Sequence, residues 1–177
     1  MATIWKLDPT HTEIQFKARH LMITNVTGSF GAFDADVETE GDNFSTAKVN
    51  FTADAASINT NNEQRDAHLK SDDFFNAEKY PKLSFASTKI EKGGSEGQYI
   101  LTGDFTIRDV TKPVKLDVEF GGVVTDPWGN VKAGLELSGK INRKDFGLNW
   151  NAVMEAGGVV VSEEIKIQCQ VELVKAA

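Results

Sequence analysis

Apolar and polar residues alternate over most of the chain. Between residues 12 and 20, Ile14, Phe16 and Ala18 are separated by polar side chains. A period of two is typical of a β-strand with one dry face and one solvated face. Seven more segments repeat the pattern, so the sequence predicts eight strands. The dry positions of these segments fall within residues 31–37, 47–53, 83–85, 99–107, 114–120, 135–141 and 165–173.

Turn-forming residues separate most of these segments, for example at 40–43, 92–97 and 126–130. Such short connections make neighbouring strands antiparallel. Since each strand has one polar face, the eight strands must bury a single shared apolar side. A closed barrel does this and leaves no free edge, and a two-sheet sandwich is the alternative. Residues 1–177 are expected to form one domain, because the chain is short for two.

Two segments break the alternation. Residues 61–80 are largely polar and place Arg65, His68 and Leu69 three and four residues apart, on one face of a short helix. We expect one or two helical turns there, lying across a barrel mouth. Residues 142–158 are apolar and rich in glycine, and they predict a loop or irregular strand at the same mouth or the opposite one.

The composition restricts the partners. The chain carries a net charge of -7, and an acidic surface weighs against nucleic acid and against anionic membrane faces. It favours a soluble monomer or a homodimer. The sequence contains no stretch of about 18 apolar residues, so no stable membrane insertion is predicted. The N-terminus also lacks an apolar signal core. We therefore expect a cytoplasmic protein, or a periplasmic one if a leader has been removed. Cys169 is the single cysteine, which excludes an internal disulfide.

The inward-facing positions mix aromatic side chains with very small ones. Small residues leave volume that aromatic rings could line, but large and small residues also alternate simply to pack a small barrel. The residues alone leave a packed core and a ligand cavity equally open. A lipid tail that lost on the order of 500 Å² of apolar surface would gain ~12 kcal/mol before ordering costs. The small inward positions are Gly31, Ala35, Ala47, Ala53, Gly103 and Gly139.

Few polar residues suggest chemistry. His20 shares the inward parity of its strand and could contact a ligand head group. Arg65 could hold a phosphate or carboxylate, or it could pin the helix to the rim through a salt bridge. The three histidines lack zinc-ligand spacing, so no metal is predicted. The sequence has no G-x-S-x-G motif and no phosphate loop, which favours a binding protein over an enzyme. An enzyme would need a perturbed titratable group in the lumen, for which His20 is the candidate.

Several long strings resemble the YceI-like family of lipocalin-like polyisoprenoid-binding proteins. The most specific is RDAHLKSDDFF at residues 65–75. Others are WKLDPTHTEIQF at residues 5–16, GDFTIRDVTKPV at 103–114 and NRKDFGL at 142–148. The resemblance runs nearly from end to end of the chain.

The resemblance implies an all-β fold, an eight-stranded antiparallel lipocalin-like barrel with a short helix near one mouth. It also implies a lumen for an isoprenoid or fatty-acyl chain. It implies no catalytic activity, no cofactor and no metal. We therefore predict a protein that carries or stores a long-chain apolar lipid. A stress-related interaction module with a packed core is the alternative. The predicted ligand-binding residues are Phe16, His20, Phe33, Phe51, Arg65, His68, Phe85, Tyr99, Phe105, Leu116 and Leu135.

Overall fold

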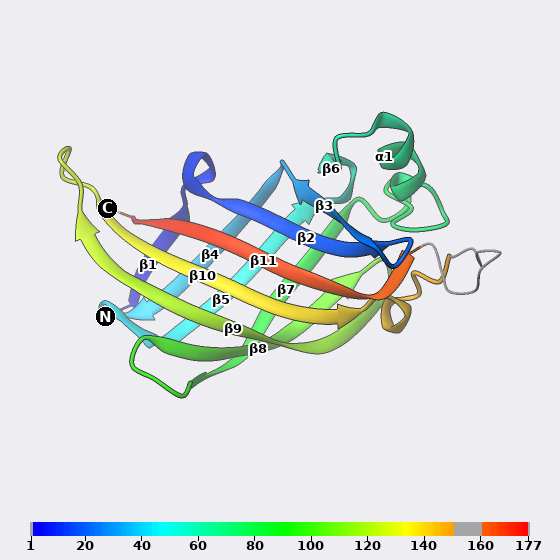
Figure 1. Cartoon of the computed structure of the whole chain (residues 1–177). Helices are drawn as coiled ribbons and strands as arrows, with labels where there is room; N and C mark the ends of the chain where they lie inside the picture. The colour runs from blue at the N-terminus through cyan, green and yellow to red at the C-terminus, as the bar shows by residue number, and fades with distance from the viewer. Residues whose placement is uncertain (1, 151–160, 177) are drawn as a thin grey trace.

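The computed structural model describes residues 2–150 and 161–176, which form one continuous β-sheet with a short helix at one end (Figure 1). Burial alternates along the strands, as the sequence pattern predicts: in the fourth strand Ala35, Val37 and Thr39 are buried and the residues between them are exposed. The helix α1 spans Glu63–Lys70, and 3₁₀ turns span Pro9–His11, Ala55–Ser57 and Arg143–Phe146. The strands are β1 (Ala2–Leu7), β2 (Glu13–His20), β3 (Thr24–Phe30), β4 (Phe33–Glu40), β5 (Asn43–Asp54), β6 (Ile58–Asn59), β7 (Lys82–Lys92), β8 (Gln98–Ile107), β9 (Val110–Thr125), β10 (Val131–Asn142) and β11 (Val161–Lys175).

Eight strands close into an antiparallel barrel in the order β1, β4, β5, β7, β8, β9, β10 and β11. The ring is completed by β1 and β11, where Trp5 lies opposite Lys175 and Leu7 lies opposite Leu173. The predicted eight-stranded antiparallel barrel with a short helix is therefore confirmed, and the sandwich is excluded.

The membership of the ring differs from the prediction by one strand. The predicted strand at residues 12–20 corresponds to β2, which pairs with β11 beyond the point where β1 ends. β3 then pairs with β2, and β6 pairs with β3, so these strands extend the sheet at one end of the barrel. The eighth place in the ring belongs to β1, and neither β1 nor β3 follows from the alternation.

The 3₁₀ turn at Pro9–His11 moves the chain from β1 to β2 while both strands stay beside β11. Its N-cap is Asp8, whose Oδ1 accepts hydrogen bonds from the amide and the hydroxyl of Thr10 at 3.1 and 2.7 Å. The Asp8 amide donates to the carbonyl of Glu172 at 2.8 Å. Because Pro9 has no N–H, the strand ladder cannot continue through it.

One end of the barrel is closed by aromatic packing. Trp5 is fully buried, and its indole Nε1 donates to the hydroxyl of Thr39 at 2.9 Å. The ring centroid of Phe44 lies 5.1 Å from that of Trp5 and 4.7 Å from that of Phe120. Ala133 is also fully buried in this cluster. We call this group the closed end of the barrel.

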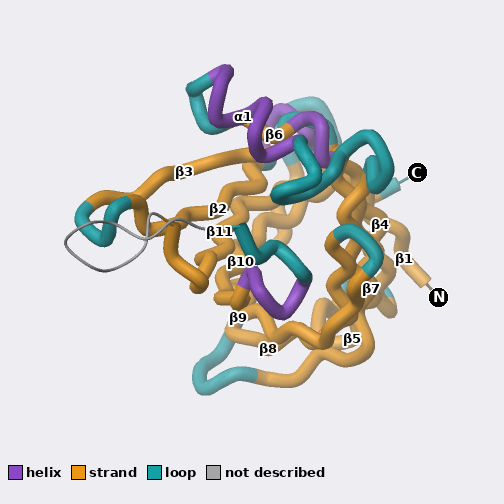
Figure 2. Tube along the Cα trace, turned by 90° about the vertical axis from the view of Figure 1, so that its right-hand side faces the viewer, coloured by secondary structure: helices purple, strands orange, loops and turns teal. Residues whose placement is uncertain are grey.

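The opposite end carries α1, which lies at the rim of the barrel (Figure 2). The Asn62 side chain caps the helix by accepting from the amide of Arg65 at 2.9 Å, as expected of an N-cap asparagine. The 3₁₀ turn Arg143–Phe146 and the turn between β2 and β3 lie at this same end (Figure 1). Among the described residues no helix is long and apolar enough to cross a membrane.

Candidate functional site

The barrel encloses a cavity of about 450 Å³. It extends from Leu173 near the closed end to Arg65 and Trp150 beside α1. This volume lies within the range typical of ligand pockets, and a barrel packed throughout would not leave it. The structure therefore favours the ligand cavity over the packed core.

Ten of the eleven predicted residues line this cavity. Phe33 instead packs against the surrounding core without lining the cavity. It lies at the start of β4, opposite Ala53 of β5. The ligand contacts of all eleven residues remain predictions. Those that the structure brings together around the cavity are Phe16, His20, Phe51, Arg65, His68, Phe85, Tyr99, Phe105, Leu116 and Leu135.

At Gly103 the small inward residue serves packing and leaves no free volume, which is one of the two alternatives that the sequence left open. A Cβ atom at this position would lie 2.4 Å from Cζ of Phe85, so the ring on the neighbouring strand already fills that space. Gly28 of β3 has the same relation to the Phe16 ring, at 2.2 Å. Glycine allows the backbone and a ring to approach closely at both positions, and at Gly103 the backbone carbonyl of Ala86 would also lie 2.6 Å from a Cβ atom. In contrast, Ala53 lines the cavity itself.

Arg65 connects α1 to the end of β6 through Thr60. Its Nε donates to the Thr60 hydroxyl at 2.8 Å, and its Nη2 donates to the Thr60 carbonyl at 2.6 Å. The carboxylate of Asp66 accepts from the Thr60 amide at 2.9 Å. The sequence left open that Arg65 pins the helix to the rim through a salt bridge. Arg65 does pin the helix, but it does so through hydrogen bonds to Thr60. Arg65 also lines the cavity.

The cavity wall beside α1 is aromatic and polar at once. His68 meets the rings of Phe74 and Trp150 edge to face, at centroid distances of 5.2 and 4.7 Å. Its Nε2 lies 2.8 Å from Oδ2 of Asp73. His20, at the end of β2, also lines the cavity. Together these residues define the mouth of the cavity.

Arg143 is a member of the site that the sequence reasoning missed. It lines the cavity although only 2% of the residue is exposed. Its guanidinium donates to the carbonyls of Leu148 and Trp150, both at 2.7 Å, and of Ser162 at 2.8 Å. Burial lowers the pKa of this guanidinium, but an arginine stays protonated in proteins. A buried positive charge therefore faces neutral carbonyl groups.

The charged groups of the cavity wall share one sign. Among the described residues that line it, the ionisable side chains with basic character are Arg19, Arg65, Arg143, His20 and His68, and none is Asp or Glu. Arg65 is held by Thr60, Arg19 donates to the carbonyl of Met22, and the charge of Glu163 acts on Arg143. The charged groups that face the cavity at this end are therefore basic in a chain of net charge -7, whereas the nearby carboxylates of Asp66 and Asp73 do not line it.

Cys169 is a titratable group inside the lumen, in addition to His20. It lines the cavity, and burial raises the pKa of its thiol to about 11. A raised pKa depletes the thiolate, which is the nucleophilic form. The group is therefore perturbed in the direction opposite to that of a catalytic cysteine.

Asp8, His11 and Glu172 offer potential metal ligands that lie within 4.8 Å of one another. The ammonium of Lys132 contacts the same carboxylates, at 3.2 Å from Asp8 and 3.3 Å from Glu172. This lysine already supplies the positive charge that a cation would bring. The cluster therefore reads as an ion-pair network that joins the β1–β2 turn to β10 and β11.

A closed antiparallel barrel with an apolar cavity and a charged mouth belongs to the class of ligand-holding β-barrels, in which the lipocalins also fall. The family model described as the YceI-like domain matches residues 5–173. The chain belongs to the YceI-like family, as its sequence strings suggest. At the level of the family and fold, this supports binding of an apolar ligand.

The relatives are bacterial. The chain is 39% identical over 171 residues to a UPF0312 protein of Staphylococcus aureus strain MSSA476, covering 96% of each. The crystal structure of Campylobacter jejuni YceI protein matches with a TM-score of 0.77 at 34% identity, over 89% of this chain and 90% of that one. Two further structures share the fold. They are Burkholderia cenocepacia BcnA (TM-score 0.80, 19% identity, 94% and 98% coverage) and a polyisoprenoid-binding domain from Saccharophagus degradans (0.70, 14%, 97% and 98%).

Proposed function

We propose that the protein binds and carries a long-chain lipid with an anionic head group. The tail lies in the barrel and the head at the mouth. The observation that carries this proposal is the polarity of the cavity wall. It is apolar along the barrel, and its charged side chains gather at the α1 end with a single, positive sign. The name of the Saccharophagus degradans neighbour agrees with an isoprenoid tail.

The dimensions suit such a ligand. At ~30 Å³ for a water-sized group, the 450 Å³ of the cavity holds on the order of 15 such groups. A chain of that many carbon atoms fits, and burying it supplies several kcal/mol beyond the ordering cost. Arg65 and Arg143 present guanidinium groups, which bind carboxylate and phosphate through paired hydrogen bonds. A binding role needs no further chemistry from the site.

The test has two parts. Organic extraction of the purified protein followed by mass spectrometry should release a lipid. Calorimetric titration of the lipid-free protein should then show farnesyl phosphate binding at least about tenfold more tightly than farnesol. Arg65→Met should remove most of that difference, whereas Lys70→Met, an exposed lysine on the same helix that does not line the cavity, should preserve it.

Each part can fail separately. Equal affinity for the phosphate and the alcohol would refute the anionic head group. An empty extract together with no uptake of either probe would refute the lipid-binding function. Thermal unfolding of Arg65→Met controls for the loss of its hydrogen bonds to Thr60.

A further inference from the structure

The turn between β2 and β3 exposes three consecutive large apolar residues. Leu21, Met22 and Ile23 have exposed fractions of 36%, 57% and 71%. The described residues include only three other large hydrophobic side chains with comparable exposure, and these lie elsewhere on the surface. Contiguous apolar exposure in a soluble protein marks an interaction surface. We call these three residues the apolar tip.

The backbone of the apolar tip is in an unfavourable conformation for these residues. Leu21 and Met22 both have positive φ, at 52° and 63°, and the amide of Ile23 donates to the carbonyl of His20 at 3.1 Å. A hairpin turn with two positive φ angles normally contains Asn and Gly, and bulky side chains rarely adopt it. Strain of this kind is concentrated at functional positions. Folding alone does not account for the large apolar side chains here.

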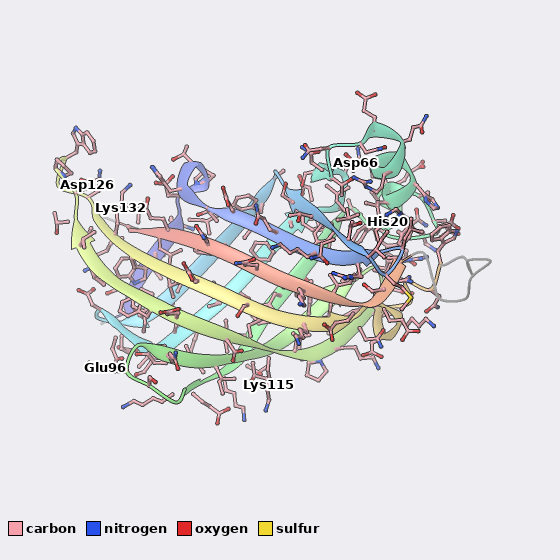
Figure 3. The ribbon with its side chains drawn as sticks, viewed as in Figure 1. His20, Asp66, Glu96, Lys115, Asp126 and Lys132 are labelled. Carbon is pink, nitrogen blue, oxygen red and sulfur yellow. The ribbon has the colours of Figure 1, made fainter. Side chains whose placement is uncertain are left out.

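The apolar tip lies at the mouth of the cavity. His20 precedes it directly, and His20, Ala18 and Val26 of the same hairpin line the cavity. Figure 3 shows His20 at the end of the barrel that carries Asp66 of α1. The hairpin therefore continues the apolar wall of the cavity outward into solvent.

The edge of β3 is open beside this wall. β3 pairs with β6 only through Ser29 and Phe30. Within the described residues, its outer edge from Thr24 to Gly28 has no neighbouring strand. A lipid chain that leaves the cavity there would pass along the hairpin toward the apolar tip.

The charge of the hairpin differs from that of the whole protein. Residues 14–33 contain no Asp or Glu, although the chain has 26 acidic residues, and they include Lys17, Arg19 and His20. Basic residues beside an exposed apolar segment suit a bilayer that contains anionic lipids. The acidic surface elsewhere would keep the rest of the molecule off such a bilayer.

We propose that the apolar tip docks on the surface of a lipid bilayer that contains anionic lipids, with the cavity mouth facing the membrane. Leu21, Met22 and Ile23 enter the interfacial region, and the basic residues of β2 contact the head groups. The docking is peripheral and reversible. This inference rests on the proposed function, because the docked orientation serves to pass a lipid between the bilayer and the cavity.

The experiment measures cosedimentation of the full-length protein with vesicles. Vesicles of phosphatidylcholine and phosphatidylserine should bind the protein, vesicles of phosphatidylcholine alone should bind it less, and added salt should weaken binding. Ile23→Asp should reduce the binding at least about tenfold. Trp128→Asp is the matched control. Trp128 is 83% exposed, and its turn begins at Asp126, at the opposite end of the barrel from His20 (Figure 3).

A second variant separates docking from folding. Leu21→Asn combined with Met22→Gly places the preferred residues in the turn, so it should unfold at a temperature equal to or higher than that of the wild type. It should nevertheless lose vesicle binding to the same extent as Ile23→Asp.

Three outcomes would overturn the inference: no binding of the wild type to either vesicle, full binding by the tip variants, or an equal loss in Trp128→Asp. Self-association abolished by Ile23→Asp, without vesicle binding, would instead identify a second copy of the chain as the partner. Farnesyl phosphate uptake, measured in the absence of vesicles, distinguishes failure of the docking inference from failure of the proposed function. If uptake persists in the tip variants and the wild type does not bind vesicles, only the docking inference fails.

Discussion

Replacing Gly103 by alanine should destabilise the barrel although it adds only one methyl group. The new Cβ would lie 2.4 Å from Cζ of Phe85 and 2.6 Å from the carbonyl oxygen of Ala86. Ordinary contacts between carbon atoms fall at about 3.5–4.0 Å, so both neighbours must move by about 1 Å. The Phe85 ring can rotate into the lumen, but the Ala86 carbonyl belongs to the backbone of β7 and cannot move freely.

Overpacking of this kind costs about 1–3 kcal/mol. For a domain of this size, that corresponds to a fall in Tm of about 2–4 °C per kcal/mol. Urea unfolding followed by tryptophan fluorescence measures the free energy directly. Gly94→Ala is the control, since a Cβ there meets no atom within 4 Å, and it should change stability by less than about 0.5 kcal/mol.

A double-mutant cycle identifies the cause. Phe85→Leu removes the outer part of the ring, so its cost should be smaller in the Gly103→Ala background than in the wild type. Additive costs would mean that the ring does not occupy the space above the glycine. Equal stability of Gly103→Ala and the wild type would refute the reasoning altogether.

Three further predictions concern single groups. Arg143→Met should lower the free energy of unfolding by roughly 3 kcal/mol, because four buried or partly buried carbonyls lose a donor; a loss below about 1 kcal/mol in urea unfolding would contradict this. Hydrogen bonds from Thr10 and then His11 hold the pKa of Asp8 below its usual value of 3.8. The stability that this carboxylate contributes is therefore present above about pH 4 and is lost as the pH falls further. Asp8→Asn should be less stable than the wild type near neutral pH, and the difference should shrink in unfolding curves recorded at about pH 3. Burial raises the pKa of the Cys169 thiol to about 11, so its rate of alkylation by iodoacetamide should rise about tenfold per pH unit up to roughly pH 10; a rate that levels off above about pH 9 would disprove the raised pKa.

The alternation of side chains predicted eight antiparallel strands with one shared dry side and favoured the barrel over a sandwich, but it failed where packing interrupts the pattern. In β3 the inward positions are Val26, Gly28 and Phe30. The middle one is glycine, and the Phe16 ring fills the space above it. The Phe16 ring of the neighbouring strand β2 takes the place of an apolar side chain at position 28. The alternation in β3 is therefore interrupted at this position. β1 is obscured differently, since Ile4 is 40% exposed beside the fully buried Trp5, and adjacent apolar residues do not indicate a period of two.

The mouth of the cavity was predictable in part. Arg65 and His68 share a helix face, which a spacing of three residues reveals. Arg143 lies in the polar string Asn-Arg-Lys-Asp, which is typical of a solvated turn. Its burial depends on the carbonyls of Leu148, Trp150 and Ser162. These groups meet only after the barrel has formed, so no local pattern in the sequence encodes them.

The closed end formed by Trp5, Phe44 and Phe120 gives the cavity a direction and a depth. Under the proposed function, a lipid would enter tail first and leave head first, because the closed end offers no second opening. A barrel filled in this way would present the head group outward to any acceptor. The wall also acts as a stop. A tail longer than the cavity would hold its head group beyond the reach of Arg65, and a shorter one would leave unfilled space against Phe44, so the proposed binding would select for chain length.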